Sequence, residues 1–215
     1  MRYKVDDITG LAAWYSGNER EHQKVFKKLI ETGDTVVNVG ANWGVHTLFF
    51  SKLVGLSGSV IAFEPLPEAM RDLRWHLSAN NCSNVRTIES AASDEDGEAF
   101  FTIGESAYTG ALAEVRPSWS QEDRLRVRTT RLDTVVESLN INRVKLIKID
   151  VEGSESKVLL GARKTIERYR PHLVIDLHTP DQDISVAGLT TSWELRLVPV
   201  TWTSDSSHGP RLAPF

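Results

Sequence analysis

The chain has 215 residues, 40% of them hydrophobic and 25% charged, which is an ordinary globular composition. Asp and Glu outnumber Lys and Arg by 29 to 25, giving a formal net charge of −4. A mildly acidic chain is a poor candidate for nonspecific binding to nucleic acid or to an anionic membrane. The single cysteine excludes an internal disulfide and any multi-cysteine metal cluster.

The chain shows no sign of a membrane span or of a targeting segment. No apolar run approaches the roughly 18 residues of a transmembrane helix. Acidic residues follow the basic start, where a signal peptide would continue with an apolar core. We therefore expect a soluble cytoplasmic protein with one domain over residues 1–215.

Helices and strands alternate through the first half of the chain. Helical spacing of apolar residues predicts a helix over 19–31, and the next apolar run predicts a strand over Thr35–Val39. Further strands are expected over Val60–Phe63 and Val85–Glu89, each preceded by a helix, and Pro67 suits a helical first turn. This β-α-β-α-β order predicts an open α/β sheet, mainly parallel, with helices on both faces.

The second half continues the pattern less regularly. Segment 103–123 is rich in small and polar residues, and a structureless stretch of this length is expected to be a functional lid or disordered. The tail holds one more predicted strand, Trp193–Val198. The expected divisions are a helical segment (1–32), a ligand-binding core (33–178) and a strand-bearing tail (179–215). Four other strands are predicted over Ala99–Thr102, Leu125–Thr130, Val144–Ile149 and Leu173–Leu177, with a helix between the last two.

Residues Val36–Gly44 read VVNVGANWG, a strand that runs into two glycines. Ligands of open α/β sheets bind at the carboxyl ends of the strands, and glycine lets backbone approach them closely. A dinucleotide site typically shows G-x-G-x-x-G, but here the middle glycine is missing. Asn42 and Trp43 would also fill the space of a pyrophosphate. An NAD-dependent oxidoreductase is therefore the weaker alternative, and a ligand without phosphates fits better.

S-adenosylmethionine (SAM) is such a ligand. Its ribose diol needs a carboxylate, and Glu64 ends the second predicted strand 24 residues after Gly40, with Pro65 stopping the strand. Ser90 and Ala91 follow the third strand, where small residues border an adenine or simply pack the sheet against a helix. The predicted cofactor-binding residues are Asn38, Gly40, Ala41, Asn42, Gly44, Thr47, Glu64, Pro65, Ser90, Ala91 and Asp150.

Five segments together resemble the FkbM family of SAM-dependent methyltransferases. The resemblance covers about residues 31–178, and its most specific element is KIDVEG-x-E, Lys148–Glu155. It implies a class I methyltransferase fold of seven strands with a reversed final hairpin. It also implies O-methylation of hydroxyls in sugars, glycolipids and polyketides. The segments are VVNVGANWGVHTLFFS, GSVIAFEPLPEAMRDLRWHLSANN, LDTVVES, VKLIKIDVEGSESKVLLGA and RPHLVIDLH.

Two positions depart from the family pattern. The family usually has Asp where this chain has Asn38, so the charge at that position is lost. The fifth strand usually ends in Glu-x-His, whereas this chain has Asp176 two residues before His178. Asn38 and the short tail keep open a second alternative, a non-catalytic SAM-fold protein that binds a partner.

Polar side chains end the two predicted strands at the catalytic edge. Asp150 and Glu152 follow the fourth strand, and Asp176 and His178 follow the fifth, so the four converge if the strands are neighbours. We expect Asp150, Glu152 and His178 to be catalytic, which argues against the non-catalytic alternative. The predicted function is SAM-dependent transfer of a methyl group to a hydroxyl of a small or glycosidic acceptor.

Two schemes for the proton of that hydroxyl follow. In the first, His178 removes it while Asp150 holds the acceptor or the amino group of SAM, since a histidine pKa near 6.5 suits a base better than an aspartate pKa near 3.9. In the second, Asp150, Asp176 and His178 bind a divalent ion such as Mg²⁺, which acidifies the hydroxyl. We prefer the metal-free scheme.

Overall fold

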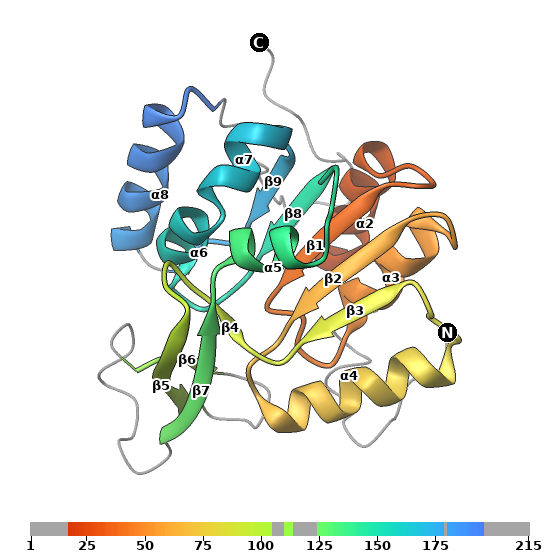
Figure 1. Cartoon of the computed structure of the whole chain (residues 1–215), viewed down its shortest axis with the longest axis horizontal. Coiled ribbons are helices and arrows are strands. Elements are labelled where there is room, and N and C mark those ends of the chain that lie inside the picture. Colours follow the sequence, from red (N-terminus) through yellow and green to blue (C-terminus); the bar gives the residue numbers. More distant parts are fainter. Residues whose placement is uncertain (1–16, 105–109, 114–123, 179, 196–215) are drawn as a thin grey trace.

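The central sheet of the computed structural model has five parallel strands in the order β3-β2-β1-β8-β9 (Figure 1). The structure describes residues 17–104, 110–113, 124–178 and 180–195. Since the chain leaves central β1 first toward β3 and later toward β9, the carboxyl end of β1 is the switch point at which such sheets bind ligands. The bounds are β1 Thr35–Val39, β2 Ser59–Phe63, β3 Val85–Ile88, β8 Leu146–Ile149 and β9 His172–Ile175.

Helices cover both faces of this sheet. Successive strand residues point to opposite faces, so Val36 packs with α2 and α3 while Val37 packs with α5 to α8. Helix α4 packs beside α3 through Met70 and Leu73. The predicted open, mainly parallel α/β sheet is thus confirmed. The helices are α2 Gly17–Leu29, α3 Val45–Val54, α4 Pro67–Ala79, α5 Leu132–Ser138, α6 Glu155–Gly161, α7 Arg163–Tyr169 and α8 Pro180–Ser192.

A second, smaller sheet follows β3 and lies at the lower left of Figure 1. Its order is β4-β7-β5-β6, and β5 pairs antiparallel with both of its neighbours. A side chain on Gly161 of α6 would lie 1.8 Å from the carbonyl oxygen of Ser93, so α6 and the end of β4 touch through backbone. The strands are β4 Ala91–Ala92, β5 Gly97–Ile103, β6 Gly110–Leu112 and β7 Arg124–Thr130.

The expectation of a structureless segment over 103–123 is wrong where the segment is described. Residues Gly110–Leu112 form β6, because Leu112 joins an apolar cluster with Phe101, Val127 and Leu66. The remaining residues of the expected lid, 105–109 and 114–123, lie outside the described part of the chain.

The tail also differs from its prediction. Helix α8 precedes Trp193, and residues 193–195 form a turn and irregular backbone, so the strand predicted over Trp193–Val198 is wrong at its start. Its last three residues lie outside the described part, as does any reversed final hairpin within 196–215. Among the described helices, none is long and apolar enough to cross a membrane.

The single helix predicted between β8 and β9 is two helices. Ala162 ends α6 and precedes α7, with φ −105° and ψ 4°. The carboxylate of Asp133 in α5 accepts the N–H groups of Lys164 and Thr165 at 3.1 and 2.8 Å. This distant side chain caps the start of α7 and so divides the predicted helix.

Candidate active site

The glycine loop after β1 lies directly against the end of β8. Gly40 has φ +78°, and a β-carbon there would lie 1.8 Å from the carbonyl oxygen of Asp150. No residue with a side chain fits this contact. Gly40 therefore sets the distance between the loop and the acidic residues that follow β8.

All five N–H groups of the loop Gly40–Gly44 already have acceptors within the protein. A phosphate needs such amides to be open toward the ligand, as at the start of a dinucleotide-binding helix. The loop therefore offers no amide cradle for a pyrophosphate, which supports the choice of SAM over NAD. The acceptors are Phe63 O for Gly40 and Ala41 (3.1 and 2.8 Å), Glu64 Oε2 for Asn42 (2.7 Å), Asn42 Oδ1 for Trp43 (2.8 Å) and Ala41 O for Gly44 (3.0 Å).

Glu64 is the buried acid at the end of β2, with 5% of its surface exposed. Burial raises its pKa to about 7, although the N–H groups of Leu66 and Asn42, bonded at 2.9 and 2.7 Å, act in the opposite direction. A carboxylate has about four lone-pair sites, so two acceptor positions are left for a ligand. Glu64 thus suits the ribose diol of SAM.

An open cavity runs along the carboxyl ends of β2, β1 and β8. The second sheet forms its far wall through Phe101, Gly110 and Leu112, which the sequence did not indicate. Eight of the predicted cofactor-binding residues line this cavity, and they are Gly40, Ala41, Asn42, Glu64, Pro65, Ser90, Ala91 and Asp150.

Three other predicted cofactor-binding residues lie behind the wall. The amide of Asn38 donates to the hydroxyl of Thr47 at 2.9 Å, and both residues are buried between β1 and α3. Gly44 packs against α4, where a β-carbon would lie 2.5 Å from Leu73 Cδ1. The structure therefore gives Asn38, Gly44 and Thr47 a place in the support of the loop rather than on the cavity surface.

The hydroxyl of Ser90 is engaged by the second sheet. It donates to the carbonyl of Arg128 at 3.0 Å and lies 2.8 Å from Thr130 Oγ1. Of the two small residues predicted to border adenine, Ser90 thus also joins β7 to the end of β3.

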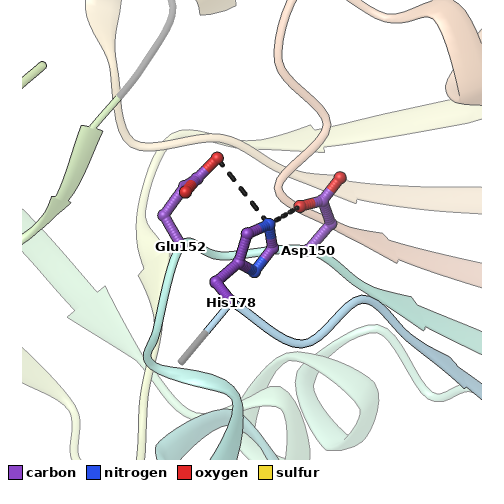
Figure 2. A group of neighbouring side chains, drawn as sticks. All are labelled: Asp150, Glu152 and His178. Carbon is purple, nitrogen blue, oxygen red and sulfur yellow. Dashed lines mark ion pairs between the residues drawn. The ribbon is translucent and has the colours of Figure 1, made fainter. Parts of the chain in front are cut away.

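Asp150, Glu152 and His178 meet at the edge of the cavity, as the neighbouring strands β8 and β9 led us to expect. Figure 2 shows His178 between the two carboxylates. Its Nε2 lies 3.3 Å from Asp150 Oδ1 and 3.8 Å from Glu152 Oε1. Its Nδ1 lies 2.9 Å from Oε1 of buried Glu155. Residues that follow the neighbouring strands β8 and β9 thus place a histidine among three acids.

This surrounding changes the protonation of His178. The hydrogen bond to Glu155 and the charges of Glu152 and Asp150 raise the pKa of His178 to about 9, against the opposing effect of burial. The side chain is therefore an imidazolium at neutral pH, with no lone pair to accept a proton. The ordinary pKa near 6.5, on which its expected role as a base depended, does not apply in this state.

The turn that carries Glu152 has unusual backbone. Glu152 has φ +55°, which costs a non-glycine residue about 1–3 kcal/mol. The next N–H group, that of Gly153, donates to Glu155 Oε1 at 3.0 Å. The strained turn is thus held by the same acid that binds His178, and it directs Glu152 toward the cavity.

The same three residues would hold a divalent cation once His178 loses its proton, because only a neutral imidazole is a metal ligand. Asp150, Glu152 and His178 offer one ligand atom each within 4.8 Å of one another; the two carboxylates suit Mg²⁺, and the imidazole suits a transition ion. The predicted third ligand, Asp176, instead lies 3.6 Å from the ammonium of Lys148. Glu152 therefore takes the place of Asp176 in the candidate metal set.

Lys148 is a charged residue of this site that the sequence reasoning missed. Only 2% of its side chain is exposed, and its Nζ donates to Asp150 Oδ2 at 2.7 Å. Burial alone would raise the pKa of Asp150, but the charge and the hydrogen bond of Lys148, together with the charges of His178 and His46, outweigh it and the pKa is lowered. The signal was present, because a lysine within the apolar run VKLIKI is out of place unless it is paired.

Comparison with known proteins gives the family of the chain. Residues 38–194 match the Methyltransferase FkbM domain. The chain belongs to the FkbM family of SAM-dependent methyltransferases. Hexuronic acid methyltransferase AglP of Haloferax volcanii is 26% identical over 180 residues, 82% of this chain and 70% of that protein. The 31-O-demethyl-FK506 methyltransferase FkbM of Streptomyces tacrolimicus is 27% identical over 179 residues, 71% of this chain and 68% of that protein.

Solved structures show the class I methyltransferase fold. Methyltransferase FkbM from Methylobacillus flagellatus has a TM-score of 0.55 at 16% identity, over 79% of this chain. This chain spans only 44% of that protein. An rRNA methylase from Streptococcus thermophilus has a TM-score of 0.52 at 15% identity, over 88% of this chain and 89% of its own. The fold alone therefore does not choose between a small molecule and RNA as acceptor.

Proposed function

We propose that this methyltransferase transfers a methyl group from SAM to a hydroxyl of a sugar or similar hydroxylated small molecule in the cytoplasm. The observation that carries the proposal is the meeting of Asp150, Glu152 and His178 beside the cavity that Glu64 and the glycine loop border. The two relatives described above support the acceptor class, since their names give a hexuronic acid and an O-demethylated compound as substrates.

The strand order suggests how SAM lies along the edge. Adenine would lie by Ala91 and the second sheet, the ribose at Glu64 on β2, and the methionine part over the glycine loop after β1. The acceptor hydroxyl would then lie over β8, beside Asp150. The order β3-β2-β1-β8-β9 supports this path, because the residues lining the cavity come from the carboxyl ends of β3, β2, β1 and β8.

SAM supplies a methyl carbon on a sulfonium; the hydroxyl oxygen bonds to that carbon while the carbon–sulfur bond breaks, and sulfur keeps the electron pair. Alignment of the reacting atoms lowers the barrier by roughly 7–11 kcal/mol. This effect is larger than the ~10²–10⁴-fold gain in rate that a general base supplies. The main task of the chain is therefore to hold the hydroxyl in line, for which Asp150 and Glu152 supply two acceptors.

The hydroxyl proton has two routes in our hypothesis. Either His178 accepts it after losing its own proton, in which case the rate rises with pH toward about 9, the pKa of His178. Or Asp150, Glu152 and His178 hold a divalent cation that would acidify the hydroxyl. Loss of all activity in a chelator, with His178→Ala active in added Mg²⁺, would reject the first route.

The first test is calorimetric titration with SAM, S-adenosylhomocysteine (SAH) and NAD. We expect binding of SAM and SAH alone, weakened about ten- to a hundred-fold in Glu64→Ala because hydrogen bonds to a charged acceptor contribute roughly 1.5–3 kcal/mol. Glu68→Ala, an exposed acid of α4, is the matched control. Failure of SAM to bind the folded protein would overturn the proposal.

The second test is transfer of a labelled methyl group to uronic acids, neutral sugars, other alcohols and rRNA, with and without Mg²⁺. Transfer to a sugar or small alcohol supports the proposal. Transfer to rRNA alone would contradict the acceptor class. Tight binding of SAM without transfer to any of them would favour the non-catalytic alternative.

A further inference from the structure

We propose that Lys148 sets the charge beside the sulfonium of the cofactor, and thereby the relative affinity of the protein for SAM and SAH. The inference rests on the proposed function, since it takes SAM as the ligand. Lys148 acts through the two carboxylates that it holds, so it is a positioning residue.

The first support is the position of Lys148 between two acids. It lies inside β8, its side chain is 2% exposed, and it is also part of the cavity wall. Its Nζ is 2.7 Å from Asp150 Oδ2 and 3.6 Å from Asp176 Oδ2, and about a third of each acid's side chain is exposed. One buried cation thus serves two carboxylates, each at the end of its strand.

The second support is the way the two oxygens of Asp150 are divided. Oδ2 is held by Lys148, whereas Oδ1 faces His178 at 3.3 Å. A carboxylate fixed on one side by a buried ammonium cannot rotate freely, so its other oxygen keeps its direction toward the cluster at the cavity edge. Lys148 therefore fixes both the charge and the orientation of Asp150.

The third support is the expected place of the sulfonium. In SAM the sulfur is joined to the ribose through one carbon, so a ribose at Glu64 places the sulfur near the neighbouring loop and the end of β8. Gly40 brings that loop into contact with the Asp150 backbone. The charge of Asp150 also helps to raise the pKa of Glu64, so the two carboxylates interact across the cavity. The sulfonium would therefore lie within reach of the charges of Asp150 and Lys148.

SAM and SAH differ by a methyl group and one positive charge, so the charge of the wall discriminates between them. A carboxylate in the wall favours SAM, and an ammonium opposes that preference. Methyl transfer removes the charge from sulfur, so a wall that binds the charged ground state too tightly would slow the reaction. Lys148 limits this by offsetting Asp150 and Asp176.

The test is calorimetric titration of the full chain with SAM, SAH and sinefungin, an analogue that carries an ammonium in place of the sulfonium. In Lys148→Met we expect the ratio of the SAH Kd to the SAM Kd to rise about tenfold, since two carboxylates lose their cation. Sinefungin should follow SAM, because the effect is one of charge. Lys52→Met, an exposed lysine at the far end of α3, should leave the ratio unchanged.

A second variant has the opposite expectation. Asp176→Asn removes one carboxylate and keeps Lys148, so the ratio should fall by a few-fold, and this variant decides the question if Lys148→Met does not fold. Equal weakening of SAM and SAH in Lys148→Met, or an unchanged ratio in Asp176→Asn, would overturn the inference. A wild-type protein that binds neither ligand would instead overturn the proposed function, and this inference with it.

Discussion

Asp133 and Asp150 are two acids that each pair with a basic side chain, but they have different roles. Asp133 is 6% exposed, and its carboxylate accepts the N–H groups of Lys164 and Thr165 and a bond from Arg131 at 3.1 Å. Asp150 is bound by the side chains of Lys148 and His178 and lines the cavity.

The difference lies in the partners. Backbone N–H groups at a helix start cannot leave, so the bonds of Asp133 belong to the fold. Asp150 Oδ2 is kept by buried Lys148, but His178 can exchange its contact with Oδ1 for a ligand, so one oxygen of Asp150 is available to chemistry. An acid saturated by backbone therefore indicates stability, and an acid held by side chains at a cavity indicates function.

The sharpest test of this contrast is Asp150→Asn. We expect methyl transfer to fall at least about 100-fold, because the amide loses the negative charge that aligns the hydroxyl and pairs with His178. The thermal unfolding midpoint should change by only a few degrees, since Lys148 keeps Asp176. Rates are measured with SAM and an acceptor found in the screen. Activity within a few-fold of wild type would place Asp150 with Asp133 among the structural acids.

The reciprocal variant is Asp133→Ala. Loss of the cap of α7 and of the bond from Arg131 should lower the free energy of unfolding by about 2–3 kcal/mol. The affinity for SAM, measured well below the unfolding midpoint, should be unchanged. Urea denaturation followed by circular dichroism gives the first quantity. A matching loss of SAM affinity in the folded variant would break the contrast.

Glu64 combines backbone partners with a place on the cavity, so it tests the boundary between the two kinds of acid. Its pKa is about 7 in the folded protein, above the ordinary 4.5, so the unfolded chain loses this proton first as pH rises. Glu64 should therefore lower the free energy of unfolding by about 2 kcal/mol between pH 5 and pH 7. Glu64→Gln should lack that component when the two proteins are compared by urea denaturation. Parallel curves of unfolding free energy against pH for the two proteins would refute this prediction.

His178 should show a smaller effect of the same sign, at higher pH. Its pKa of about 9 lies above the ordinary 6.5, so its stabilising contribution is complete below pH 6.5 and is lost as pH rises through 9. The unfolding midpoint of the wild type should fall by a few degrees more than that of His178→Gln between pH 7 and pH 9.5. Scanning calorimetry measures both. Identical changes of the unfolding midpoint with pH in the two proteins would mean that the acids around His178 do not raise its pKa.

The parallel core could be predicted because its strands are buried on both faces and separated by helices with clear apolar stripes. Strand Thr35–Val39 was predicted with the bounds that the structure shows. In the second sheet, β5 and β7 were predicted as strands, but β4 and β6 were not, since they have only two and three residues, too few for any periodicity. The break at Ala162 depends on Asp133, a contact that local sequence does not contain.

The candidate site divides in the same way. The proximity of Asp150 and His178 could be predicted because adjacent parallel strands end at one edge of the sheet. The partners of each could not, since the hydrogen bond that His178 donates to Glu155 and the ion pairs of Lys148 depend on side-chain directions. Side-chain direction also decides the place of Asn38. It was predicted to bind the cofactor, but its side chain points from β1 toward Thr47 and α3.

The saturated glycine loop has an energetic consequence for cofactor binding. A segment whose five amides are already bonded is rigid before the ligand arrives, so little conformational entropy is lost on binding. Recognition must then come from carboxylates, carbonyl oxygens and apolar walls, groups that suit hydroxyls, an ammonium and a neutral base. Entry and exit of the cofactor would then require no refolding of the loop Gly40–Gly44.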